Sequence, residues 1–288
     1  MVKKDIYQDV TNQIINALEN GTAPWRKSWA CNGAGDPLRH NGVPYKGINW
    51  LLLQLSPWGA AHWLTYKQAQ AEGGQVRKGE KGSPVVFFKK ITVEDKSTGE
   101  DVQIPMLRHY TVFNAEQIDG LPEKYYPRPI ERNPDDTCAA TEKLIAETGA
   151  EMRHGGDSAY YSPGQDFVQM PHFAAFDSAV AYYGTALHEL THWTGHEKRL
   201  DRNIKNAFGS KDYAREELVA EIGAAMLCSA LGLENTVRED HSSYIDGWLK
   251  VLREDKRAIF KAAAMAQRAA DYLSGNLAEK TEAETEAA

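Results

Sequence analysis

The chain has 288 residues, of which 42% are hydrophobic and 25% are charged, and its formal net charge is −7. This is the composition of an ordinary soluble protein, and no apolar run approaches the length that spans a membrane, so we expect no membrane partner. The length suits two domains, each able to bury its own core.

The three cysteines, Cys31, Cys138 and Cys228, lie far apart and form no C-x-x-C pair. An odd number of distant cysteines argues against a disulfide framework and against a cysteine zinc site. The N-terminus also lacks the apolar core of a signal peptide. We therefore expect a cytoplasmic protein.

The front of the chain predicts short helices around one β-hairpin. Apolar residues recur at helical spacing near the N-terminus, and glycine, proline and turn-rich segments separate the later elements. In chain order we expect a helix over 5–20 ended by Gly21, a buried helix over 45–53, a helix opened by a capping box at Thr65–Gln68, a basic turn over 76–82, hairpin strands over 85–93 and 102–113, and proline-rich sequence over 122–134.

The back of the chain predicts mostly helices. The tail from Glu279 is too polar to fold and is expected to be disordered. Before it we expect, in chain order, a helix over 136–148, strands over 159–161 and 167–170, a helix that starts at Asp177 or Ser178, a helix over 213–231 ended by Gly232, and one long helix or a helical pair over 241–274.

Charge is distributed unevenly between the two parts. Residues 1–130 hold 16 Lys and Arg against 13 Asp and Glu, whereas residues 131–288 hold 17 against 27. Between Trp25 and Lys90 the count is 10 basic to 3 acidic. A polyanion would therefore be attracted to the front and repelled by the back.

Aromatic rings are interleaved with cations in the front part, where five of the seven tryptophans fall within 39 residues. Single-stranded nucleic acid is held this way, by base stacking on rings and by cations along the phosphates. Two alternatives stay open: the rings, Trp50 or Phe87 above all, belong to the core, or the cations form a solvated face. The residues expected to bind nucleic acid are Trp25, Arg26, Lys27, Trp29, Tyr45, Lys46, Tyr66, Lys67, Arg77, Lys78 and Lys81.

The strongest motif is His188-Glu189-x-x-His192. On a helix, residues i and i+4 lie one above the other, so both imidazoles point to one place, where they could bind zinc with Glu189 beside them. Gly195 follows at the place where a left-handed glycine ends a helix. The alternative is a helix with two surface histidines.

The third metal ligand is expected from the following helix, as in zincin metallopeptidases. Lys198 stands where the metzincin variant has histidine, and His196 is a weaker candidate beyond the glycine. We predict Glu217 as the ligand and Glu221, one turn later, as a hydrogen-bond partner of a ligand histidine, with the two roles open to exchange. The expected cofactor is one Zn²⁺ per chain, or another divalent transition metal.

These residues predict metal-assisted amide hydrolysis. Glu189 would take a proton from the attacking water and pass it to the leaving amine. Tyr160, Tyr161 and His154 are candidates for stabilising the oxyanion. The strand over 167–170 could bind a substrate peptide edge to edge.

The order of motifs resembles the ArdC antirestriction proteins, which conjugative plasmids encode. The likeness runs from about residue 5 to residue 231. It rests on P-W-R-K-x-W, Y-x-G-I-N, T-Y-K-Q-A, V-R-K-G-E-K-G, Y-Y-G-T-A-L-H-E-L-T-H-W-T-G-H-x-x-R-L and E-E-L-V-A-E-I-G-A.

The resemblance implies an α+β protein of two domains that protects incoming plasmid DNA from restriction in a recipient cell. A small α+β domain with a β-hairpin over residues 1–125 would bind single-stranded DNA. Residues 126–133 would be a linker, 134–278 a mostly helical zincin-like metallopeptidase domain, and 279–288 a disordered acidic tail.

Two rivals remain. One is a single-stranded-DNA-binding protein with a structural or vestigial metal site and no peptidase activity. The other is a nucleic-acid enzyme that uses the metal on phosphate, which the acidic back part and the histidine-rich site disfavour. A peptidase would also need a protein substrate, for which the host restriction system is the candidate source.

Overall fold

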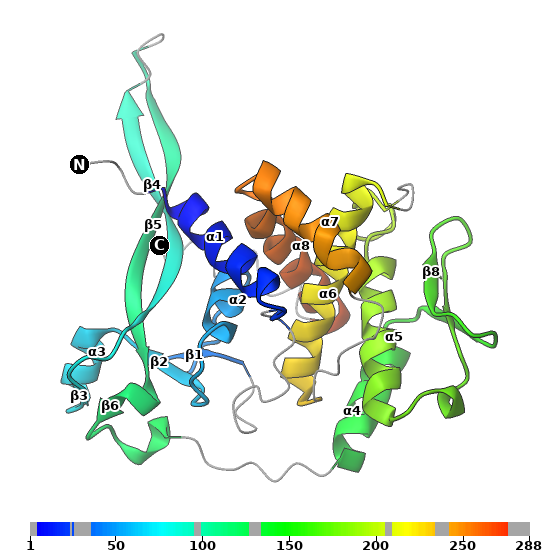
Figure 1. Cartoon of the computed structure of the whole chain (residues 1–288), viewed down its shortest axis with the longest axis horizontal. Helices are drawn as coiled ribbons and strands as arrows, with labels where there is room; N and C mark the ends of the chain where they lie inside the picture. The colour runs from blue at the N-terminus through cyan, green and yellow to red at the C-terminus, as the bar shows by residue number, and fades with distance from the viewer. Residues whose placement is uncertain are drawn as a thin grey trace.

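The computed structural model describes residues 5–23, 25, 36–94, 99–126, 134–204, 209–233 and 242–275. Figure 1 shows the α+β architecture that the sequence predicts, with strands and a long hairpin on one side, helices across the middle and a second group of strands on the far side. No helix in these ranges is long and apolar enough to cross a membrane. The expected linker, apart from residue 126, and the expected acidic tail lie outside the described residues.

The front part is built on a small sheet with strand order β1-β2-β5-β4 and on a separate pair, β3 and β6. Local signals in the sequence place its helices: Asp5 caps α1, and Thr65 forms the predicted capping box of α3. The elements are α1 (Ile6–Glu19), β1 (Leu38–Arg39), α2 (Ile48–Gln54), β2 (His62–Leu64), α3 (Tyr66–Ala71), β3 (Gln75–Val76), β4 (Ser83–Glu94), β5 (Asp101–Asn114), the 3₁₀ turn η3 (Ala115–Gln117), β6 (Ile118–Asp119) and the 3₁₀ turn η4 (Glu123–Tyr125).

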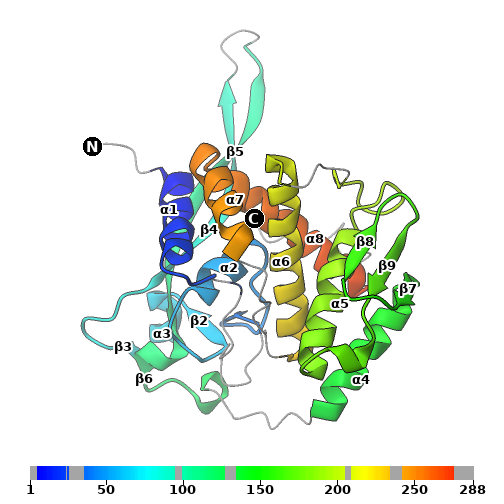
Figure 2. The same ribbon diagram turned by 45° about the vertical axis from the view of Figure 1, so that its right-hand side comes forward.

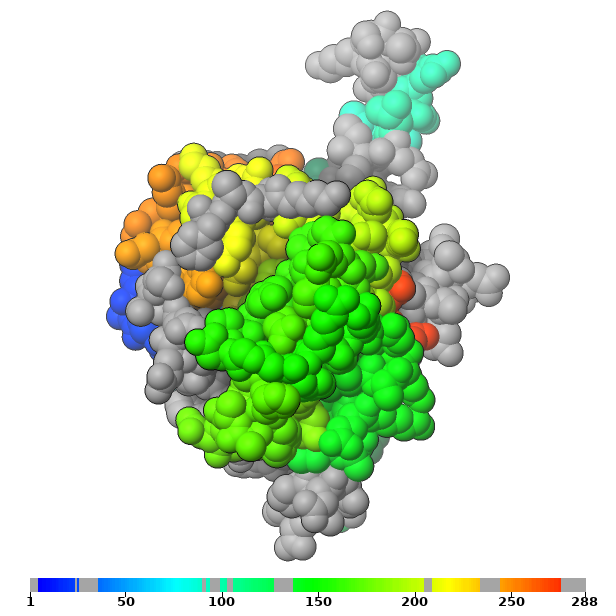
Figure 3. Space-filling model, turned by 90° about the vertical axis from the view of Figure 1, so that its right-hand side faces the viewer, coloured from blue at the N-terminus to red at the C-terminus, as the bar shows by residue number. Residues whose placement is uncertain are grey.

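The hairpin of β4 and β5 is longer than predicted. Its register runs from the pair Ser83 and Val112 to the pair Glu94 and Asp101. Because β5 pairs with β2 only near its end, the outer part of the hairpin is a two-stranded ribbon that extends from the body (Figures 1 and 2). In the space-filling view the coloured atoms of its outer part stand clear of the rest of the molecule (Figure 3).

The back part combines helices with a three-stranded sheet of order β7-β9-β8. The segment over 241–274 is a helical pair, α7 and α8, the second of the two alternatives. The elements are α4 (Pro134–Glu147), β7 (Glu151–His154), β8 (Tyr160–Ser162), β9 (Phe167–Met170), the 3₁₀ turn η5 (Phe173–Ala175), α5 (Ala179–Trp193), α6 (Lys211–Leu231), α7 (Ser242–Glu254) and α8 (Ala258–Leu273).

Strand β9 lies in the middle of its sheet, paired with β7 on one side and β8 on the other. Its backbone hydrogen-bonding groups are therefore already used by neighbouring strands. The prediction that this strand binds a peptide edge to edge is wrong, because only β7 and β8 present an edge.

The main core crosses the predicted domain boundary. Residues of α1 and α2, such as Ile14 and Trp50, belong to the same buried cluster as residues of α6, α7 and α8. The ring of Trp25 meets that of Trp248 edge to face, with centroids 5.5 Å apart. Two smaller clusters belong to the front part alone. The expectation of a separate core for each domain is therefore not met.

Hydrogen bonds also join the front and back parts of the chain. The hydroxyl of Thr11 donates to the backbone carbonyl of Lys256 at 2.8 Å, and the amide of Gly47 donates to the Gln267 side chain at 2.9 Å. Partly buried hydrogen bonds of this kind help to fix the relative position of packed elements. The front and back parts thus form one packed body across α1, α2, α7 and α8.

This shared core makes a prediction about stability. Trp25→Ala and Trp248→Ala should each lower the free energy of unfolding by about 3–5 kcal/mol, because both rings are almost fully buried. The double variant should lose less than the sum, by about 1 kcal/mol, since the rings touch each other. Urea denaturation of the full chain measures both effects; strict additivity would contradict the contact.

Candidate functional site

Helix α5 carries the two histidines of the motif. Its start is fixed by Ser178, whose hydroxyl oxygen accepts a hydrogen bond from the amide of Ala181 at 3.1 Å. Leu187 and Leu190 are fully buried and hold one face of the helix in the core. This leaves His188 and His192 one turn apart, with ring centroids 4.9 Å apart.

Helix α6 brings a carboxylate to these histidines. It begins at the Ser210 cap and ends, as predicted, at Gly232, which has a left-handed conformation at φ 73°. Gly223 packs against Thr191 of α5, where an added Cβ would lie 2.7 Å from the threonine Cγ2. This glycine lets the two helices approach closely, and Glu217 lies on the part of α6 that faces α5.

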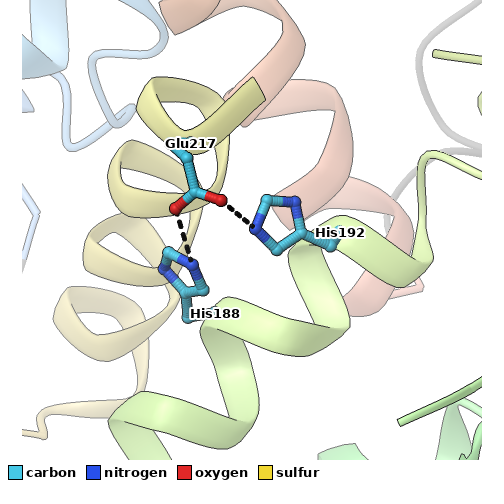
Figure 4. Close-up of side chains that lie close together, drawn as sticks. All are labelled: His188, His192 and Glu217. Atoms are coloured by element: carbon cyan, nitrogen blue, oxygen red, sulfur yellow. Dashed lines mark ion pairs between the residues drawn. The ribbon is translucent and has the colours of Figure 1, made fainter. Parts of the chain in front are cut away.

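The three side chains form one compact group, shown in Figure 4. Glu217 Oε2 lies 3.6 Å from His188 Nε2, and Glu217 Oε1 lies 3.4 Å from His192 Nε2. One ligand atom from each residue falls within 4.8 Å of the others. Two imidazole nitrogens and one carboxylate oxygen at this spacing form a donor set that fits a divalent transition metal.

Two further glutamates contact the outer nitrogens of the rings. Glu221 Oε1 lies 3.4 Å from His188 Nδ1, as the sequence led us to expect, and Glu216 Oε1 lies 3.2 Å from His192 Nδ1. Carboxylates in these positions orient the rings of ligand histidines and make them better donors. The contact of Glu216 was not predicted.

Arg202 holds Glu216 in place. Its Nη2 donates to Glu216 Oε1 at 2.8 Å and to the carbonyl of Thr191 at 2.6 Å. This arrangement could not be predicted from the sequence, because Arg202 lies in the loop after α5, where no spacing rule fixes its direction. Each of the two histidine rings is thus contacted by a further glutamate of α6.

The charges of this group are strongly coupled. Burial lowers the pKa of His192, but its hydrogen bonds to Glu216 and Glu217 outweigh this and raise the pKa to about 10. Burial raises the pKa of Glu217, but the two histidines bring it well below its usual range. The group therefore favours a buried carboxylate with positive charge beside it, which a bound cation would supply.

Glu189 lies next to this group on α5, and its side chain is buried. Tyr213, one turn before Glu217 on α6, was missed by sequence reasoning. Its hydroxyl lies 3.3 Å from that of Tyr244. Burial raises the pKa of Tyr213, and Tyr244 and the carboxylate of Glu217 raise it further. A neutral phenol therefore stands beside the carboxylate.

Several predicted neighbours of the site lie elsewhere. The Tyr161 hydroxyl donates to Asp166 at 2.8 Å, and His154 contacts the Tyr182 hydroxyl at 2.9 Å. Tyr160 is 47% exposed. His196 accepts a hydrogen bond from the backbone of Lys198 and is not one of the three grouped residues.

The prediction that a left-handed Gly195 ends α5 is wrong. Gly195 does not have a positive φ, and α5 ends at Thr194 in a right-handed conformation. Its role is close packing. A Cβ at this position would lie 2.5 Å from Ile204 Cγ2 and 3.0 Å from Arg202 Nη2. The glycine thus leaves room for the loop that carries Arg202.

The predicted nucleic-acid residues divide into three groups. Arg26, Lys27 and Trp29 lie outside the described residues. Trp25 and Tyr45 are 2% and 4% exposed, so the prediction that these rings stack on bases is wrong for this structure. The remaining six residues reach the surface: Lys46, Tyr66, Lys67, Arg77, Lys78 and Lys81.

Two of these surface cations already have anionic partners. Lys46 lies 3.4 Å from the buried carboxylate of Asp271, and Arg77 lies 2.8 Å from Glu80 and 3.4 Å from Asp119. The ring of Tyr66 is 43% exposed, and Lys67, Lys78 and Lys81 are exposed. Their role in binding stays a prediction.

Rings that the prediction left out are at the surface. Trp50 is buried as expected, but Phe87 is 42% exposed, so its assignment to the core is wrong. Phe88 and Tyr110 are 53% and 37% exposed. Both strands of the long hairpin therefore present aromatic side chains.

Two family models match the chain. The model described as the N-terminal domain of anti-restriction factor ArdC matches residues 4–113, and that of a zincin-like metallopeptidase matches residues 139–265. The metal-free crystal structure of the antirestriction ArdC protein from plasmid R388 is 48% identical, covers 96% of this chain and 99% of that one, and superposes with a TM-score of 0.82. Its Mn(II)-bound structure is 47% identical, covers 95% and 98%, and gives 0.79.

Relatives of other lengths also match. The uncharacterized protein y4eC of Sinorhizobium fredii (strain NBRC 101917 / NGR234) is 42% identical over 93% of this chain and 91% of its own length. A DNA primase TraC of Escherichia coli is 42% identical over 94% of this chain. The chain spans only 27% of that primase.

The contact of Glu216 with His192 gives a second prediction. Glu216→Gln should weaken binding of a divalent metal by roughly tenfold to a hundredfold, because it removes the charge that orients His192. Glu217→Gln should weaken it more, since a ligand atom is lost. Isothermal titration with Zn²⁺ measures both, with the exposed Glu197→Gln as control. Equal losses in Glu216→Gln and Glu197→Gln would contradict this role.

Proposed function

The chain belongs to the ArdC family of antirestriction proteins, and from this premise we propose that it binds single-stranded DNA and carries a zinc-dependent metallopeptidase site. Together these would protect incoming plasmid DNA from restriction in the host. The observation that carries the metal half of the proposal is the grouping of His188, His192 and Glu217 on two packed helices.

Support for a metal comes from two independent sources. The donor set consists of two imidazoles and one carboxylate, and each imidazole contacts a further glutamate through its other nitrogen. Catalytic zinc sites use this arrangement. A 47% identical relative has a Mn(II)-bound structure. Manganese in that protein supports a divalent cation here, and the nitrogen-rich donor set favours zinc.

In the proposed reaction His188, His192 and Glu217 would hold the metal. When bound, the metal would act as a Lewis acid toward a substrate carbonyl and toward water. Glu189 would accept the proton of the attacking water and deliver it to the leaving amine. Tyr213 is better placed than Tyr161 or His154 to donate a hydrogen bond near the reacting carbonyl, because it lies beside Glu217.

Support for DNA binding comes from the front part of the chain. Lys78 and Lys81 lie in an exposed basic turn, and exposed rings lie on the neighbouring hairpin. Cations and stacking rings together are what single-stranded DNA requires. The acidic back part would repel the same ligand.

The metal assignment gives a third prediction. The purified protein, loaded with zinc and desalted, should keep about one zinc per chain, and His188→Ala or His192→Ala should lose it. Elemental analysis by mass spectrometry measures the content, with His40→Ala as a histidine control outside the site. Full retention of zinc in both site variants would refute the proposed centre.

The fourth prediction asks whether proteolysis is needed for protection. Glu189→Gln should keep the metal and the fold but lower peptidase turnover by roughly a hundredfold to ten-thousandfold, because only the proton acceptor is removed. In conjugation into a restricting host, a proteolytic mechanism requires that this variant fails to protect the plasmid.

The same assay tests the alternative function, a single-stranded-DNA-binding protein with a structural or vestigial metal site. In that case Glu189→Gln protects fully, and Lys78→Ala with Lys81→Ala does not. The exposure of these two lysines is the observation that favours this alternative.

A further inference from the structure

One face of the β4–β5 ribbon carries rings and cations that the metal centre does not use. Residues directly opposite each other in an antiparallel pair point to the same face. The pairs Val85 with Tyr110 and Phe87 with Arg108 therefore share a face, and so does Lys89. The rings of Phe87 and Tyr110 lie 5.8 Å apart at an angle of 56°.

The inner end of this face is fixed to the body. Val85 is fully buried in a cluster with Tyr45. The Tyr110 hydroxyl adjoins that of Tyr45. Burial raises the pKa of Tyr45, and the neighbouring Tyr110 hydroxyl raises it further. Arg39 lies over the Tyr45 ring with Cζ 5.5 Å from the centroid. Exposed Arg39 thus continues the face beyond Tyr110.

The opposite face of the ribbon contacts α2 and the main core near the body. It carries Val86, which is buried in the main core, and the pair Phe88 and Leu107. Asn49 of α2 binds the backbone of Val86 twice, with both contacts at 2.7 Å. The inner end of the ribbon is therefore anchored on this face as well, although Phe88 itself is exposed.

The charge of the ribbon near the body is uniformly positive. Residues 83–90 and 105–114 include Lys89, Lys90, Arg108 and His109 and contain no Asp or Glu. Arg108 and Lys89 belong to the face of Phe87 and are exposed, and neither has an ion-pair partner among the described residues. This is unusual in a chain whose net charge is −7.

We propose that single-stranded DNA lies along this face, with bases stacked on Phe87 and Tyr110 and phosphates held by Arg108, Lys89 and Arg39. The inference rests on the proposed DNA-binding function and assigns its surface. Rings that alternate with cations suit unpaired bases, whose faces are free to stack. A duplex hides those faces, and a protein partner would not require such uniform positive charge.

The surface can be tested with a matched pair of substitutions. Phe87→Ala and Phe88→Ala remove the same side chain at adjacent positions on opposite faces. In the full chain, Phe87→Ala and Tyr110→Ala should each weaken binding of a fluorescent 20-nucleotide oligo(dT) by about tenfold. Phe88→Ala should leave binding within about twofold. Fluorescence anisotropy gives the affinities, and thermal unfolding shows that each variant is folded.

The cations are tested by salt. Arg108→Ala should weaken binding and reduce the slope of log K against log salt by roughly 0.7, because one phosphate contact is lost. Lys250→Ala, at an exposed position of α7, is the charge control and should leave the slope unchanged. A duplex of the same sequence should bind more weakly than oligo(dT), and equal binding would overturn the assignment to single strands.

The outcomes separate this inference from the function on which it rests. If the wild type binds oligo(dT) and Phe87→Ala, Tyr110→Ala and Arg108→Ala bind equally well, the assigned face is wrong while DNA binding stands. Equal losses in Phe87→Ala and Phe88→Ala would overturn it as well. A wild type that binds no oligo(dT) would overturn both the DNA-binding function and its surface.

Discussion

The close approach of α5 and α6 is the contact on which the metal centre depends. The histidines come from one helix and the carboxylate from the other, so their distances are set by how closely the helices pack. Gly223 allows this approach, because any larger side chain would collide with Thr191. Gly223 lies six residues after Glu217 on α6. Its missing side chain lets the helices pack closely enough for a buried carboxylate to meet two imidazoles. A wider separation would leave three polar groups in the core without partners.

The second constraint is the shared core. Helices α1 and α2 belong to the front part in sequence but pack on α7 and α8, and α8 packs against α5 and α6. The front sheet and the metal centre are thus attached to the same group of helices. Such packing limits independent movement of the two parts, since separating them would expose Trp25, Trp248 and their neighbours to water. It also explains why the boundary seen in the sequence, between 125 and 134, is not a boundary of the core.

Local signals predicted more than long-range ones. The capping box at Thr65, the cap at Ser178 (one of two predicted starts) and the helix end at Gly232 depend on neighbouring residues, and the structure has all three at predicted positions. The spacing of the histidine motif likewise requires only one helix. By contrast, the middle position of β9 depends on which strands pair with it. The contact of Arg202 with Glu216 and the burial of Trp25 depend on segments far apart in the sequence. Composition alone could not tell a stacking ring from a core ring, because both are aromatic and near cations.

Charge and position together separate the two proposed activities on one body. In Figure 1 the ribbon lies at one side of the molecule, and α5 lies toward the other. The part of the chain that carries the metal centre has the excess of acidic residues, so a DNA strand would be drawn to the ribbon and kept from the metal. The buried glutamates that surround His188 and His192 add to this repulsion. The same electrostatic pattern thus favours a DNA-binding surface on the front and a substrate other than a polyanion at the metal.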